Sequence, residues 1–336
     1  MRRLTILIAA LALVWGGYWW SGASAFERGA RGWLDARATE GWTAAYASVE
    51  THGFPSRFDT TITGLALGDP AGVWLWEAPF VQLLMLSYAP NRAVLAWPHE
   101  QSLTLGGARA EIRSEKMTAS VRLAPEPALP LDAFTAIAER LAVEAGAGWR
   151  TGAREARLAT RRTEALENGQ NLGLLLTDLI LPEGARAAVD PGGRLPERID
   201  LVRIDADLGL DAPWTPLFPG PRPPRPTALA LREARMEWGG IAAIASGRID
   251  VDAAGIPEGR IDLRVENWRP IPALLAATGL IDPAAEGAAT QAMEALAALG
   301  GEANAIDAPL VFEEGRMRIG PVPLGAAPRL AVPSLP

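Results

Sequence analysis

The fold is decided by a pattern that occurs twice near the C-terminus, GRIDVD at residues 247–252 and GRIDLRV at residues 259–265. Apolar and charged side chains alternate in both segments, which is the two-residue period of a β-strand with one face in water. The apolar residues that share one face are Ile249, Val251, Ile261, Leu263 and Val265. Residues 253–258 between the segments contain glycine and proline, which favour a turn. The stretch therefore predicts an antiparallel hairpin with one apolar face.

Strands of the same kind are expected along most of the chain. Between residues 42 and 123, short β-type segments alternate with glycine, proline and asparagine turn signals. The predicted strands include residues 58–63, 81–88, 93–97, 102–105, 108–113, 117–123, 172–181, 199–210, 309–312 and 316–319, whereas residues 149–167 fit a strand or a helix. Consecutive strands joined by short turns form an antiparallel meander. The sequence therefore predicts an α+β protein that is mainly antiparallel β.

Three segments after the N-terminus are predicted to be helical: residues 26–39, residues 131–145, and residues 272–299 with a break near residues 279–283. In residues 131–145 the apolar side chains that recur at helical spacing are Leu131, Phe134, Ile137, Ala138 and Leu141. A one-sided sheet must bury its apolar face. Because these helices are too few to cover it, we expect a long antiparallel sheet that curves into a groove or holds something apolar on its concave face.

Residues 213–226 contain several prolines, which favour an extended and semi-rigid linker. We therefore expect this segment to separate a β-rich region at residues 26–212 from a second one at residues 227–336, with residues 1–25 preceding both.

The first 20 residues carry two arginines and then an apolar run that ends in aromatic residues. The expected anchor residues are Leu4, Leu7, Leu11, Trp15, Trp19 and Trp20. The run from Leu4 covers about 17 residues, or about 25 Å of helix, which is short for a hydrocarbon core of about 30 Å. Residues 23–25 (Ala-Ser-Ala) also match a signal-peptide cleavage site. The segment is therefore a retained anchor of the inner membrane or a removed signal, and in both cases the rest of the chain is exported to the periplasm.

Composition excludes several classes of function. The formal net charge of −7 disfavours a nucleic-acid partner, because phosphates are met by a positive field. The chain has no cysteine and only two histidines, His52 and His99, which excludes thiol catalysis and a histidine-rich metal site. We expect no catalytic residues, no metal, no cofactor and no enzyme activity.

Four tryptophans are the candidates for an apolar binding groove, Trp74, Trp76, Trp97 and Trp149, although burial in the core explains them equally well. Two carboxylate pairs, Asp205 with Asp207 and Asp250 with Asp252, fit a calcium or acid–base site, but alternation in a half-exposed strand gives the same spacing. Arginines between residues 150 and 162 suit anionic head groups or a solvated face.

Several segments carry a resemblance to a known family. The sequence HGFPSRF at residues 52–58 resembles the Gly-Phe-Pro signature of a signal-anchored proteobacterial family, domain of unknown function 2125. Residues 246–269, the broken helix, and GRMRIGPVPLG at residues 315–325 resemble the same family and, more distantly, the C-terminal region of AsmA-like envelope proteins. The resemblance implies an elongated, groove-forming β-sheet in the periplasm with a membrane tether. It brings no catalytic residues.

These observations predict a membrane-tethered periplasmic protein whose curved sheet binds or shields lipid-like molecules in cell-envelope maintenance. The alternative is a structural or protein-interaction module with no small-molecule ligand. The membrane is the expected partner in both cases.

Overall fold

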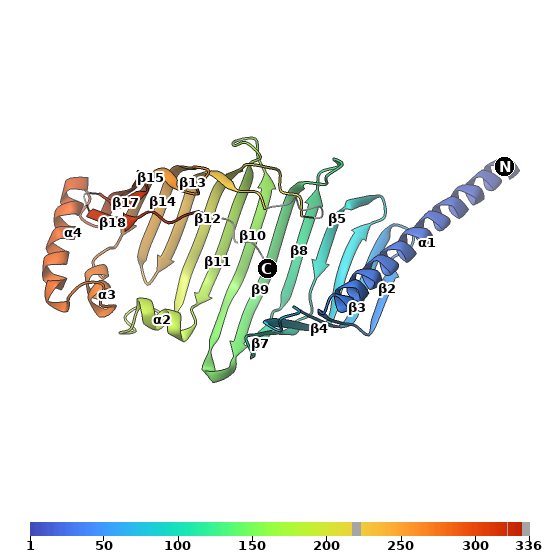
Figure 1. The fold of residues 1–336 in the computed structure, drawn as a ribbon, viewed down its shortest axis with the longest axis horizontal. Coiled ribbons are helices and arrows are strands. Elements are labelled where there is room, and N and C mark those ends of the chain that lie inside the picture. The colour runs from blue at the N-terminus through green and yellow to red at the C-terminus, as the bar shows by residue number, and fades with distance from the viewer. Residues whose placement is uncertain (217–222, 321, 331–336) are drawn as a thin grey trace. The chain divides into compact units, whose positions relative to one another are not determined.

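The computed structural model describes residues 1–216, 223–320 and 322–330 (Figure 1). Within these residues eighteen strands form a large antiparallel sheet, which confirms the predicted fold class. The expected curvature of this sheet into a groove stays a prediction.

The helices and strands have the following bounds. The helices are α1 (Arg2–Thr39), α2 (Glu183–Val189), α3 (Ile271–Ala277) and α4 (Glu286–Gly300), with single 3₁₀ turns η1 (Gly146–Gly148) and η2 (Pro283–Ala285). The first nine strands are β1 (Thr43–Ala45), β2 (Ser48–His52), β3 (Arg57–Gly68), β4 (Trp74–Leu86), β5 (Ala89–Ala96), β6 (Glu100–Leu105), β7 (Ala108–Arg113), β8 (Lys116–Leu123) and β9 (Leu131–Ala145). The others are β10 (Arg150–Arg162), β11 (Gln170–Ile180), β12 (Arg198–Leu210), β13 (Pro226–Trp238), β14 (Ile241–Val251), β15 (Pro257–Glu266), β16 (Ala305–Glu313), β17 (Arg316–Ile319) and β18 (Val322–Ala326).

The chain divides into two compact units. Unit 1 comprises residues 1–125 and 134–149, and unit 2 comprises residues 126–133 and 150–336. The linker expected at residues 213–226 stays a prediction as a domain boundary, and its residues 217–222 lie outside the described residues.

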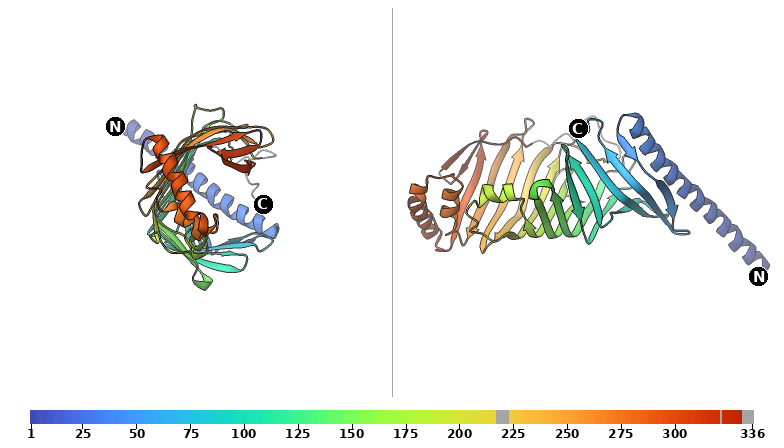
Figure 2. Two further views of the ribbon diagram at one scale, coloured as in Figure 1. Left: turned by 90° about the vertical axis from the view of Figure 1, so that its left-hand side faces the viewer. Right: turned by 90° about the horizontal axis from the view of Figure 1, so that it is seen from below.

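In unit 1 the part of α1 from about residue 15 onward packs on the sheet, while the residues before it project away (Figure 2). The helix residues Trp19, Ala23, Phe26 and Leu34 recur at three- to eight-residue intervals and face β3 and β4. Phe58 of β3, which is 2% exposed, lies beneath this stripe. The apolar stripe of α1 and the apolar face of unit 1 therefore form one core.

Helix α1 also covers the edge of unit 1 at β2, which pairs with β3 on its other side. Glu27 accepts a hydrogen bond of 2.7 Å from the backbone N–H of Thr51, and Arg31 donates one of 2.6 Å to the carbonyl oxygen of Val49. An open strand edge exposes unpaired backbone groups. These side chains satisfy two of them.

The strands of unit 1 form a meander with one departure from strict order. Long strand β4 pairs through its first residues with β6 and through its last residues with β5. Strand β5 then pairs with β8, so the β6–β7 hairpin is inserted between neighbours. The strands predicted between residues 58 and 123 are all present.

In unit 2 the strands from β10 to β17 pair in chain order, each antiparallel to the next (Figure 1). The hairpin predicted at residues 247–265 is β14 and β15, and the ambiguous residues 149–167 contain strand β10. The broken helix predicted at residues 272–299 is α3 and α4, separated by η2.

The helix predicted at residues 131–145 is wrong, because these residues form strand β9. Their apolar residues also fit a two-residue period, and helix propensity is a weak prior that tertiary context overrides. Residues 110–113 of β7 pair with residues 142–145 of β9, which gives the backbone a hydrogen-bonding partner along the sheet. One of the three helices expected to cover the sheet is therefore itself part of the sheet.

Candidate functional site

One face of unit 2 is continuously apolar. Residues that are direct partners in neighbouring strands lie side by side on the same face of a sheet. The pairings from β10 to β16 align seven apolar residues, called here the apolar row: Leu158, Leu174, Ile204, Ala234, Ala245, Leu263 and Ala308. A second aligned set on this face is Ala156, Leu176, Val202, Met236, Ala243, Val265 and Ile306.

The apolar row is incompletely covered. The side chain of Leu158 is 49% exposed, and the other six residues of the row are half-buried. In a sheet with one buried face, burial alternates along a strand, but every residue from 171 to 180 of β11 is half-buried. Within the described part of the chain, residues 171–180 of β11 are therefore fully buried on neither face.

The helices of unit 2 cover only one end of this face. Trp268, Ala297 and Ile306 form a buried cluster against α3 and α4, and Val265 of the second set packs on it. Leu195, Ile199, Trp238 and Ile241 form another cluster, against which Val202 packs. Within the described residues the apolar row lies outside both clusters. The second set is thus partly core, whereas the described residues of the row belong to neither cluster.

The opposite face of unit 2 carries charges that neutralise one another. Arg248 pairs with Asp250, Arg260 with Asp262 and Arg264 with Glu266, each two residues along its own strand. The arginines of β10 behave in the same way, since Arg154 pairs with Asp178 and Arg157 with Glu155. Such exposed pairs are typical of a solvated face.

The structure brings two of the predicted groove tryptophans together. Trp76 and Trp97 pack on the cluster formed by Leu34, Leu65 and Val81, beneath α1. The indole N–H of Trp76 donates a hydrogen bond of 2.7 Å to Oε1 of Gln101. Both residues therefore contribute to the packing of unit 1, and their place in a binding groove stays a prediction.

The other two groove tryptophans lie elsewhere in unit 1. Trp74 makes an edge-to-face contact with Trp42 at 5.9 Å between ring centroids. Trp149 is exposed and directly follows η1. The four tryptophans therefore do not form one cluster, and the groove that they would line stays a prediction.

The predicted anchor residues all lie in α1. Leu4, Leu7 and Leu11 are exposed on the projecting part of the helix. One helix, Arg2–Thr39, is long and apolar enough to cross a membrane. Trp15 and Trp19 instead contact unit 1, through hydrogen bonds from their indole N–H groups to the carbonyl oxygens of Pro55 and Arg57. Trp20 is exposed.

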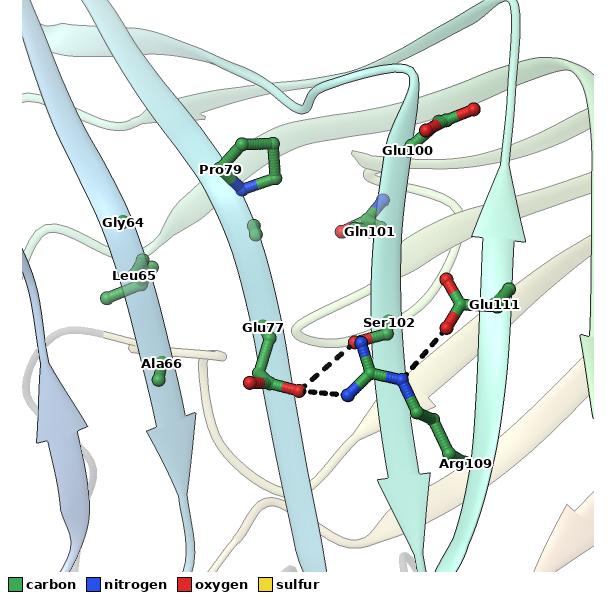
Figure 3. A pocket seen from close by; sticks show the side chains of 11 residues that line it. Gly64, Leu65, Ala66, Glu77, Pro79, Glu100, Gln101, Ser102, Arg109 and Glu111 are labelled. Atoms are coloured by element: carbon green, nitrogen blue, oxygen red, sulfur yellow. Dashed lines mark hydrogen bonds and ion pairs between the residues drawn. The ribbon is translucent and has the colours of Figure 1, made fainter.

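A shallow polar depression of about 410 Å³ lies on unit 1 (Figure 3). In it, Arg109 donates hydrogen bonds to Glu77 and Glu111, at 2.5 Å and 2.8 Å. The hydrogen bonds to Glu111 and Glu77 hold the pKa of Arg109 above its ordinary value. The third carboxylate that lines the depression, Glu100, pairs with Arg113 at 3.8 Å between Oε1 and Nε. Each carboxylate of the depression therefore already has an arginine partner.

The two carboxylate pairs also have partners. Arg232 binds both Asp205 and Asp207, and Asn171 donates to both. Asp252 accepts hydrogen bonds from two backbone N–H groups of its turn. His52 is exposed beside Glu50, and His99 lies 3.1 Å from the carbonyl oxygen of Ser114. The partners of the two histidines in these contacts are a carboxylate and a backbone carbonyl oxygen, and neither is a hydroxyl nucleophile.

Sequence reasoning missed the apolar row. The alternation of single strands was visible, but alignment of seven strands depends on their register and on three register shifts in the pairings of β13. The run of leucines at residues 172–176 was the local signal, but such a run also fits a strand that is buried on both faces.

The comparisons place the chain in a family. No curated protein matches this chain, and no solved structure matches it either. A family model described as "Uncharacterized protein conserved in bacteria (DUF2125)" matches residues 19–328. The match begins at Trp19, within the part of α1 that packs on the sheet, and includes nearly all of both units. The chain therefore belongs to the DUF2125 family.

Proposed function

We propose that this protein is held at the periplasmic face of the inner membrane by α1 and that the apolar face of unit 2 binds the acyl chains of lipids, in maintenance of the cell envelope. The observation that carries the proposal is the apolar row, seven aligned aliphatic side chains that are half-buried or exposed. A contiguous aliphatic face that is incompletely buried is a candidate binding surface.

The dimensions of the row suit an acyl chain. Strands lie about 4.8 Å apart, so seven strands span about 29 Å. One leaflet contributes about half of a hydrocarbon core of about 30 Å, so the row exceeds the reach of a phospholipid acyl chain. Contact with the chain removes apolar surface from water, at about 25 cal/mol per Å².

The membrane is the source of the lipid that we propose to bind at the apolar row. The two N-terminal arginines favour a cytoplasmic N-terminus, which puts both units on the periplasmic side. A retained α1 keeps unit 2 close to a lipid source. The charged side chains of the opposite face are already paired with one another, so the aliphatic side chains are the groups left to bind a ligand. This supports a binding rather than a catalytic role.

Two neighbouring leucines provide the test. Leu174 lies in the apolar row, whereas Leu175 lies on the opposite face, in register with Arg157 and Arg203. Both are half-buried. A glutamate at position 174 puts a charge in the acyl-chain site, but a glutamate at position 175 meets arginines.

Native mass spectrometry of the full-length protein, released from detergent micelles with added palmitoyl-oleoyl phosphatidylglycerol, measures the bound lipid. We expect the wild type and Leu175→Glu to retain lipid, and Leu174→Glu to bind it at least about tenfold more weakly, which is about 1.4 kcal/mol. Equal binding by all three proteins contradicts the proposal. Absence of lipid together with stoichiometric crosslinking to one protein favours the interaction module instead.

A further inference from the structure

We infer that two turns of unit 1, residues 53–56 and residues 87–88, enter the lipid interface beside α1 and seat the sheet on the membrane. The inference rests on the retained anchor of the proposed function. These turns lie at one end of the sheet, since β2 leads into the first turn and β4 into the second. We call the two turns the membrane-end turns.

The membrane-end turns are joined to each other and to α1. The backbone N–H of Ser87 donates a hydrogen bond of 2.9 Å to the carbonyl oxygen of Ser56. The Tyr18 hydroxyl donates one of 2.6 Å to the carbonyl oxygen of Ser87, and the Trp15 indole donates one of 2.9 Å to that of Pro55. The depth of these helix residues in a membrane therefore fixes the depth of both turns.

The helix before this contact is too short to span a membrane alone. Arg2 to Val14 is about 13 residues, or about 20 Å of helix, whereas the hydrocarbon core is about 30 Å thick. If the arginines stay among the cytoplasmic head groups, the segment from Trp15 to Trp20 lies in the outer part of the bilayer. The membrane-end turns must then lie at the same level.

The side chains of these turns suit that position. Phe54 is 59% exposed and Tyr88 is 66% exposed, although both are aromatic. Phe54 makes an edge-to-face contact with Trp19 at 5.5 Å between ring centroids. Exposed Trp15, Tyr18 and Trp20 lie in the adjoining turns of α1. Tryptophan and tyrosine are enriched at membrane–water interfaces, where one end of the ring is apolar and the other is hydrated.

The turn between β3 and β4, at the other end of these two strands, provides a matched control. Val73 lies in the turn between β3 and β4, at the end of these strands away from the membrane-end turns. It is 56% exposed, close to the value for Phe54. Because Phe54 and Val73 match in exposure and apolar character, a difference in lipid contact between the two positions reflects their location relative to the membrane.

Site-directed spin labelling tests the inference directly, because the chain has no native cysteine. The full-length variants Phe54→Cys, Tyr88→Cys, Val73→Cys and Leu7→Cys are labelled and reconstituted in vesicles of phosphatidylethanolamine and phosphatidylglycerol. Collision with oxygen, which concentrates in lipid, is compared with collision with a water-soluble nickel chelate. We expect the oxygen-to-nickel ratio at positions 54 and 88 to exceed that at position 73 several-fold.

The label at position 7 separates two kinds of failure. If position 7 is in lipid while positions 54 and 88 match position 73, the turns stay in water and the inference is wrong, but the anchor stands. If position 7 is in water, or if residues 1–25 are removed, the anchoring itself fails and the inference fails with it.

Discussion

The hydroxyl group of Tyr18 in α1 donates a hydrogen bond of 2.6 Å to the carbonyl oxygen of Ser87, a fully buried residue between β4 and β5. Tyr18 belongs to the apolar N-terminal segment, so part of that segment is built into unit 1. Three helix aromatics, Tyr18, Trp19 and Phe26, surround Phe58 at 6.4, 6.1 and 5.2 Å between ring centroids. If the segment were removed as a signal peptide, the core around Phe58 would lose Tyr18 and Trp19, which argues for a retained segment.

The first prediction concerns cleavage. Removal after Ala25 takes away Trp19 and Ala23, which exposes Phe58 and Met85 to water. We therefore expect the mature protein to retain residues 1–25. Intact mass measurement of the protein extracted from membranes checks this, and a mature chain that begins at Phe26 contradicts it.

The second prediction compares two glycines of α1. A Cβ atom on Gly22 would lie 2.5 Å from Cζ of Phe58, whereas one on Gly29 meets nothing within 4 Å. Gly22→Ala should overpack this contact and destabilise the protein by about 1 kcal/mol or more. Gly29→Ala should stabilise it by up to about 1 kcal/mol through helix propensity. Thermal unfolding in detergent micelles measures both, and equal shifts in the melting temperature would show that α1 does not pack on Phe58.

The third prediction concerns the carboxylate pair at Asp205 and Asp207. The Asp207 side chain is 7% exposed and relies on Arg232 for charge compensation. Arg232→Leu leaves this carboxylate buried with Asn171 as its remaining side-chain donor, which should cost about 2 kcal/mol of stability. Arg248→Leu removes an exposed pair with Asp250 and should change stability by less than about 0.5 kcal/mol. Chemical denaturation of the two variants distinguishes a structural ion pair from a solvated one.

The fourth prediction is a pH dependence. The hydrogen bond from Arg232 holds the pKa of Asp205 below its ordinary value, partial burial opposes this, and the hydrogen bond from Asn171 adds to the lowering. A lowered pKa in the folded state stabilises the protein fully at neutral pH, and this contribution is lost as the pH falls below about 4. Because Asp205 is 45% exposed, the contribution should be below about 1 kcal/mol.

The variant Asp205→Asn checks that dependence. Its melting temperature should lie below that of the wild type at pH 7, and the difference should narrow as the pH falls from about 4 to about 2. A difference that is constant over this range would mean that the effect comes from packing and not from the charge of Asp205.

Much of the fold was predictable because strand alternation is a local property. The alternation at residues 247–265 predicts which side chains of β14 and β15 share a face. The turn signals between residues 58 and 123 predict where the strands of unit 1 begin and end. The prediction of a helix at residues 131–145 was wrong because their apolar residues fit both the helical period and the two-residue period of a strand. Pairing with β7 decides between them, and a sequence does not reveal such a long-range partner.

The candidate site was less predictable for a related reason. The four tryptophans were chosen by residue type, but their positions depend on how α1 docks on unit 1, which covers Trp76 and Trp97. The apolar row combines one residue from each of seven strands, so it exists only once their register is set. The apolar N-terminal helix was predictable because length and hydropathy are local, whereas the contacts of Trp15 and Tyr18 with the membrane-end turns join residues 40 and 69 positions apart.

Photo-crosslinking is the most direct measurement of acyl-chain binding by unit 2. The full-length protein is reconstituted in vesicles that contain a phospholipid with a diazirine near the end of one acyl chain, and the adducts are located by peptide mass spectrometry. The account predicts adducts on β10–β13 at the apolar row, around Leu174 and Ile204, in addition to those on α1. Adducts confined to α1 and the membrane-end turns would contradict it.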